Sequence, residues 1–138
     1  NLLLRDQSFI DAIKSFSERK PIFGTCAGMI LMSKNSFDKK VLNMNILDIE
    51  VSRNAYGRQV HSFEDSITLE SKQDNSRLIK ASFIRAPKIT SIGEDVEVLC
   101  KNNNEIVGVK QGIHMAVTCH PELQNEILLH KLCFESSV

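Results

Sequence analysis

The segment Gly24-Thr25-Cys26-Ala27-Gly28 constrains this chain more than any other, because it lies between two apolar runs. Pro21-Ile22-Phe23 precedes it and Met29-Ile30-Leu31-Met32 follows it, which predicts a strand, a sharp turn and a helix with Cys26 at the apex. The flanking glycines allow a tight turn without Cβ clashes. The turn aims a helix N-terminus at the sulfur, which favours the thiolate. The pattern G-x-C-x-G is the cysteine counterpart of the G-x-S-x-G nucleophile elbow.

A second element, His120-Pro121-Glu122, supplies the groups that make such a cysteine reactive. An imidazole can take the thiol proton, and a carboxylate on its other nitrogen fixes its tautomer and orientation. Proline disfavours helix at the preceding residue, so we expect an extended His120 with Glu122 on the same side. Residues 114–119 read as a buried strand that delivers His120 to a sheet edge. The two elements predict a Cys-His-Glu hydrolase. The plainer alternatives are a buried structural thiol and a turn proline between solvated side chains.

These motifs resemble those of the class I (triad) glutamine amidotransferases. The blocks 53–59, 62–64, 84–87 and 111–112 narrow the resemblance to the glutaminase subunits of pyridoxal 5′-phosphate synthase, over nearly the whole chain. The resemblance implies hydrolysis of L-glutamine to L-glutamate and ammonia. It also implies a hetero-oligomer in which the ammonia passes to a synthase subunit for vitamin B6 synthesis. No cofactor is expected.

The resemblance also implies roles for individual residues. A bidentate guanidinium suits the α-carboxylate of glutamine, and a backbone N–H beside the nucleophile suits an oxyanion. The implied roles are Cys26 as nucleophile, His120 as general base and acid, Glu122 as orienting carboxylate, Arg53, Ile84 and Arg85 as substrate contacts, and Ala27 as an oxyanion donor.

The sequence departs from the family pattern at its start. Family members begin with a strand-helix-strand region that ends in a Gly-Gly-Glu-Ser loop, which supplies another oxyanion donor and grips glutamine. This sequence opens at Asn1-Leu2-Leu3-Leu4, and we interpret it as N-terminally incomplete. We expect little glutaminase activity from the chain as written. The alternatives are a non-catalytic fragment that at most docks onto the synthase, and a class I amidotransferase of another pathway.

Composition limits the classes of binding partner and the cellular compartment that we expect for this chain. Lys plus Arg and Asp plus Glu are equal at 17 each, so no basic excess predicts a nucleic-acid partner. No apolar run approaches the length of a membrane span, so no membrane association is expected. The four cysteines form no C-x-x-C pair, which favours a reducing cytoplasm. Cysteines and histidines lack paired ligand spacing, so we expect no metal site.

The remaining pattern predicts one α/β domain over residues 1–138. Its fold is expected to be the flavodoxin-like mixed sheet of class I glutamine amidotransferases, flanked by helices and lacking its N-terminal strand-helix-strand portion. Asn102-Asn103-Asn104 signals a hairpin. The expected helices are 7–19 with Asp6 as N-cap, 26–34 and 124–134, a loop is expected over 71–77, and the expected strands are 21–24, 46–51, 66–69, 81–84, 96–100, 106–110 and 115–119.

Overall fold

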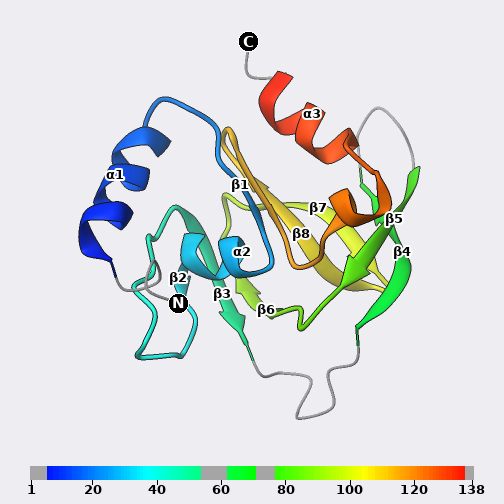
Figure 1. Cartoon of the computed structure of the whole chain (residues 1–138), viewed down its shortest axis with the longest axis horizontal. Helices are drawn as coiled ribbons and strands as arrows, with labels where there is room; N and C mark the ends of the chain where they lie inside the picture. Colours follow the sequence, from blue (N-terminus) through cyan, green and yellow to red (C-terminus); the bar gives the residue numbers. More distant parts are fainter. Residues whose placement is uncertain (1–5, 54–61, 71–76, 136–138) are drawn as a thin grey trace.

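The computed structural model describes residues 6–53, 62–70 and 77–135, and in this part of the chain helices pack around two β-sheets (Figure 1). The six-stranded sheet has the order β1-β9-β8-β7-β4-β5, and the three-stranded sheet has the order β2-β3-β6. The strands are β1 (Phe23–Thr25), β2 (Ser33–Asn35), β3 (Leu47–Ser52), β4 (Phe63–Leu69), β5 (Arg77–Phe83), β6 (Lys88–Ile92), β7 (Glu97–Asn102), β8 (Glu105–Gln111) and β9 (His114–Val117). The helices are α1 (Gln7–Ser17), α2 (Ala27–Met32), the 3₁₀ helix η2 (Pro121–Gln124) and α3 (Leu128–Glu135).

The first helix begins as predicted. The Asp6 carboxylate accepts the Phe9 N–H at 3.1 Å, which satisfies one of the free donors at a helix start. Helix α1 ends at Ser17, two residues earlier than predicted. Ile10 is buried against the core, whereas Phe16 near the end of the helix is 52% exposed.

The six-stranded sheet is mixed, as the fold class requires. Strands β1 and β9 run parallel with Thr25 opposite Val117, whereas the other pairs in this sheet are antiparallel. Because parallel strands share their direction, the residues that follow β1 and β9 emerge at the same end of the sheet. The Cys26 turn and the His120 segment are those residues.

Two short elements differ from the sequence-based prediction. The helix after Cys26 ends at Met32 rather than at residue 34, and Ser33–Asn35 forms β2 beside β3. Residues 88–92, which we did not predict to be a strand, form β6 and pair antiparallel with β3. Both strands contain polar residues without clean alternation, so partners in the fold decide their structure.

The predicted hairpin is confirmed between β7 and β8. Asn103 and Asn104 take φ values of 49° and 69°, a left-handed conformation that asparagine tolerates better than most residues. Residues 71–76 of the predicted loop lie outside the described residues, and Arg77 already belongs to β5.

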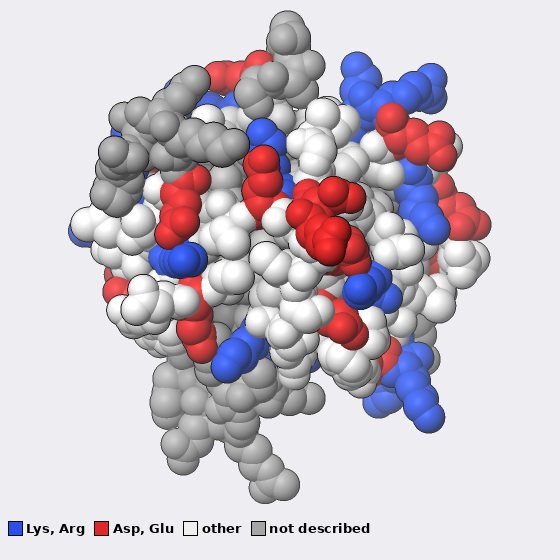
Figure 2. Space-filling model, turned by 180° about the vertical axis from the view of Figure 1, so that it is seen from behind, with Lys and Arg blue, Asp and Glu red and all other residues white. Residues whose placement is uncertain are grey.

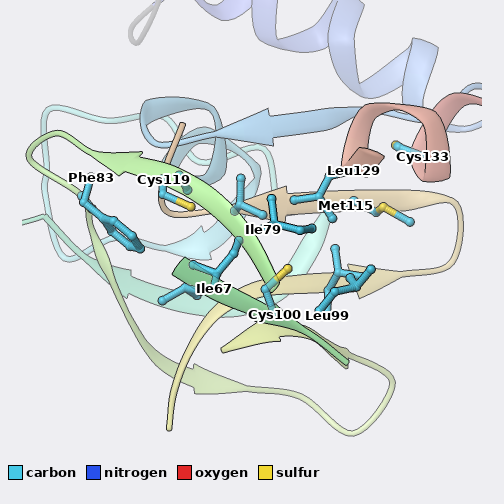
Figure 3. Close-up of a cluster of buried hydrophobic side chains, with 14 residues drawn as sticks. Ile67, Ile79, Phe83, Leu99, Cys100, Met115, Cys119, Leu129 and Cys133 are labelled. Carbon is cyan, nitrogen blue, oxygen red and sulfur yellow. The ribbon is translucent and has the colours of Figure 1, made fainter. Parts of the chain in front are cut away.

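Buried apolar side chains form two clusters that share β9. Met115 and Val117 belong to the cluster beneath α3, and Ala116 belongs to the cluster beneath α1 and α2. Figure 3 shows the first cluster, in which Leu129 and Cys133 of α3 approach Met115. Helix α3 begins four residues later than predicted, and its apolar side chains pack in this cluster. Each large side chain buried in this way contributes about 1.5–3 kcal/mol relative to exposure.

The surface does not separate its charges into one-sign regions on the face seen from behind. Lys and Arg are interspersed there with Asp and Glu (Figure 2). In the described part of the chain, no helix has both the length and the apolar character needed to cross a bilayer.

Candidate active site

Cys26 occupies a strained position between β1 and α2. Its φ of 52° and ψ of −106° are unusual for a residue with a side chain. Its N–H donates to the Val117 carbonyl at 2.9 Å, which ties the turn to β9. The sequence predicts a strand-turn-helix with cysteine at its apex, and the structure has this arrangement.

The two glycines beside Cys26 are not equivalent. A Cβ on Gly24 would lie 2.5 Å from Met32 Sδ and 2.9 Å from the Gly28 carbonyl carbon, because α2 folds back closely over β1. A Cβ on Gly28 would lie more than 4 Å from the other described residues, apart from its chain neighbours and the backbone of its own helix. The predicted avoidance of a Cβ clash therefore applies to Gly24 but not to Gly28.

Glu122 reaches the His120 ring. Its Oε1 lies 2.7 Å from His120 Nδ1, and both side chains are partly exposed. Contrary to the sequence-based prediction, the His120–Glu122 contact does not depend on an extended segment. Glu122 lies in η2, and His120 directly precedes this helix. Pro121 at the first helical position, where no N–H is needed, starts the turn that brings the two side chains together.

The end of β5 connects the two parts of the site. Ser82 and His120 form a β-bridge with hydrogen bonds of 2.7 and 3.1 Å. The Cys26 thiol lies 3.6 Å from the Ile84 carbonyl oxygen and 3.9 Å from that of Arg85, and it donates to these oxygens rather than to His120. Arg85 takes a φ of 47°, so the chain turns sharply beside the sulfur.

Burial governs the protonation of Cys26. It raises the pKa of the thiol, while the Ala27 N–H and the positive charge of Arg53 act in the opposite direction and Glu122 adds to the rise. The net shift is upward. The N-terminus of α2 acts in the direction that the sequence predicts, because the Ala27 N–H lowers the pKa of the thiol, but burial outweighs this contribution.

Arg53 is held by a neighbour that the sequence did not reveal. Its Nη1 donates to Asp38 Oδ2 at 2.7 Å, and Asp38 Oδ1 accepts the Lys40 N–H at 2.9 Å. These contacts lower the pKa of Asp38, the Lys40 N–H most strongly. Residues 54–59, the rest of the block that narrowed the family resemblance, lie outside the described residues.

The other cysteines have no access comparable to that of Cys26. All four are free thiols, but Cys100, Cys119 and Cys133 are buried and Cys26 is half-buried. Burial raises the pKa of Cys119 to about 12. Within the described residues, no group of three or more His, Cys, Asp or Glu side chains could hold a metal ion.

Comparison with solved structures gives the class of protein. A chain described as "Crystal structure of glutamine amidotransferase" superposes with a TM-score of 0.81 and 35% identity, covering 99% of this chain and 71% of that one. The fold is therefore an α/β fold of the class I glutamine amidotransferase type. The sequence model of the SNO glutamine amidotransferase family matches residues 1–138, and the chain belongs to that family.

Curated relatives agree with this assignment. "Pyridoxal 5'-phosphate synthase subunit PdxT" of Oenococcus oeni is 41% identical over 129 residues, covering 94% of this chain and 66% of the relative. The protein of the same name from Methanococcus aeolicus is 44% identical over 125 residues, covering 90% of this chain and 63% of the relative. The match thus spans about two thirds of the length of these relatives.

Proposed function

We propose that this chain carries the glutaminase chemistry of a pyridoxal 5′-phosphate synthase: it hydrolyses the side-chain amide of L-glutamine to L-glutamate and ammonia. The family assignment and the PdxT relatives support this proposal. The single observation that carries it is the His120–Glu122 contact of 2.7 Å, at the sheet end where the Cys26 turn also lies.

The first half of the reaction forms a thioester. The thiol turns from the Ile84 carbonyl toward His120, and Nε2 takes its proton because Glu122 occupies Nδ1. The sulfur attacks the amide carbon, and the carbonyl electrons move onto oxygen. The Ala27 N–H stabilises this oxyanion. When the oxyanion collapses, the C–N bond breaks and the His120 proton passes to the leaving nitrogen, which departs as ammonia.

The second half releases glutamate. A water molecule gives a proton to His120 Nε2 and attacks the thioester carbon. Collapse of the second tetrahedral intermediate breaks the C–S bond, and the proton on His120 returns to the sulfur. Glu122 stabilises the imidazolium in both halves by accepting from Nδ1. The products are glutamate and the free thiol.

Arg53 and the end of β5 orient the substrate. The Arg53 guanidinium can pair with the α-carboxylate of glutamine, because one of its nitrogens is held by Asp38 and the planar fork offers further donors. Ile84 and Arg85 face the sulfur through their backbone carbonyls. These carbonyls can accept from the substrate once the thiol has turned away.

The proposal includes the partner and the compartment. The ammonia passes to a synthase subunit in a hetero-oligomer, as the names of the relatives suggest. Four free thiols suit the reducing cytoplasm. Residues 1–138 act as one glutaminase domain.

Glutamate release tests the proposal. A version of the protein extended N-terminally to the length of its PdxT relatives is assayed with glutamine, alone and with a pyridoxal 5′-phosphate synthase subunit, beside residues 1–138, Cys26→Ala and a Cys133→Ala control. We expect release from the extended protein that requires Cys26 and increases with the synthase subunit, and little release from residues 1–138. Binding to the synthase without any release would instead support a non-catalytic docking role. Release that is indifferent to the synthase would favour an amidotransferase of another pathway.

A further inference from the structure

Ser82 and Gln124 form a contact that neither the sequence motifs nor the reaction requires. Gln124 Nε2 donates to Ser82 Oγ at 2.8 Å, from the last residue of η2 to the penultimate residue of β5. Ser82 is only 7% exposed, so its hydroxyl needs a protein partner. The contact therefore joins η2 to an edge strand of the six-stranded sheet.

The main chain of Ser82 makes a second connection. Its N–H donates to the His120 carbonyl at 3.1 Å and its carbonyl accepts the His120 N–H at 2.7 Å. One residue thus holds His120 through its backbone and η2 through its side chain. Two residues further on, the Ile84 carbonyl receives the Cys26 thiol.

Glu122 explains why such a connection is needed. Its Oε1 contacts His120, but its Oε2 is buried and has no hydrogen-bond partner among the residues that the structure describes. A buried carboxylate oxygen without a partner carries a desolvation penalty, which favours movement of η2 toward water. Such movement would separate Glu122 from the imidazole. A second attachment of η2 to the sheet opposes it.

We propose that the Ser82–Gln124 hydrogen bond is a positioning contact that holds η2 on β5 and thereby keeps Glu122 against His120. Its effect on turnover rests on the proposed glutaminase function, whereas its effect on the His120–Glu122 contact does not. Ser82 and Gln124 are positioning residues and touch no reacting atom.

The test follows the His120 Nδ1–H proton, whose low-field NMR resonance is assigned by its loss in His120→Asn. The variants are Ser82→Ala, Gln124→Ala and their combination. Ser82→Thr keeps the hydroxyl. Asn35→Ala serves as a control in the other sheet, because it removes a half-buried amide hydrogen bond of 3.0 Å to Glu50 together with the bond of 3.0 Å that Asn35 Oδ1 accepts from the Phe37 N–H. If Gln124→Ala fails to fold, Gln124→Asn keeps the amide but shortens its reach.

We expect the resonance to broaden or vanish in Ser82→Ala and Gln124→Ala, because water gains access to the ring. It should persist in Ser82→Thr and Asn35→Ala. The kcat for glutamine should fall about three- to tenfold in each single variant, with KM unchanged and no further fall in the double variant, as one shared hydrogen bond predicts.

A resonance that survives in Ser82→Ala and Gln124→Ala contradicts the positioning role, whatever the activity. Equal loss of the resonance in Asn35→Ala also contradicts it, because the effect would then be general destabilisation. Absence of glutamate release from the N-terminally extended protein without substitutions overturns the proposed function instead, and the NMR comparison still decides the positioning role.

Discussion

Thr25 and Val117 are direct partners in the parallel pair of β1 and β9. Cys26 follows Thr25 immediately, and its N–H returns to the Val117 carbonyl at 2.9 Å. His120 lies just beyond Val117 and is held by Ser82 of β5. Residues from distant parts of the sequence therefore meet at one sheet end because strand register places them there.

The His120–Glu122 contact gives the first prediction. Glu122→Gln should lower kcat about 10²-fold or more, within the range that general acid–base catalysis contributes. The neutral amide can no longer stabilise the imidazolium. The KM for glutamine should change little. Steady-state glutamate release measures both constants, and Glu126→Gln on the same segment is the control. A Glu122→Gln enzyme with unchanged kcat would remove Glu122 from the mechanism.

The close approach of α2 to β1 predicts unequal effects at the two glycines. Gly24→Ala should lower the free energy of unfolding by about 1–3 kcal/mol, because its Cβ collides with Met32 Sδ and with the Gly28 backbone. Gly28→Ala should leave stability unchanged or slightly raised, since its Cβ meets open space. Chemical denaturation measures both variants. Equal destabilisation would show that the elbow needs both glycines.

Arg53 gives a prediction about substrate affinity. Arg53→Lys should raise the KM for glutamine about 10- to 100-fold, as expected for loss of hydrogen bonds to a charged group. The value of kcat should fall less, because the guanidinium acts away from the scissile amide. Arg77→Lys, at the exposed start of β5, is the matched control. An unchanged KM would exclude Arg53 as the carboxylate ligand.

The raised pKa of Cys26 predicts the pH dependence of its alkylation. Iodoacetamide reacts with the thiolate, so the rate at Cys26 should keep rising above pH 9.0, the ordinary value for a thiol. The folded protein also binds this proton more tightly than the unfolded chain. The resulting contribution to stability is full below pH 9.0 and is lost as pH rises through the folded-state pKa. Peptide mapping across pH measures the rate, and a plateau below pH 8 would contradict the prediction.

The sequence predicts the structure best where the pattern is local. The apolar runs around Cys26 predict the strand-turn-helix, Asp6 predicts the start of α1, and the asparagines predict the β7–β8 hairpin. Each of these depends on interactions between residues that are close in the sequence. The alternating runs also locate most of the later strands, with ends shifted by a few residues.

Contacts between distant segments could not be read in the same way. His114 accepts the Ile22 N–H at 3.1 Å, and burial lowers its pKa. His130 stacks on Phe23 with ring centroids 4.5 Å apart. The orientation of the Cys26 thiol toward Ile84 also depends on how β5 ends beside α2. Such contacts arise from tertiary packing, and the periodicity of the sequence does not predict them.

Covalent capture tests most sharply whether Cys26 is the residue that attacks glutamine. A diazoketone analogue of glutamine is incubated with the protein and the modified cysteine is located by peptide mass spectrometry, with His120→Asn in parallel. The account predicts modification at Cys26 only, with Cys100, Cys119 and Cys133 spared because they are buried, and slower capture in His120→Asn. Modification of another cysteine with Cys26 untouched, or capture that glutamine does not slow, would contradict it.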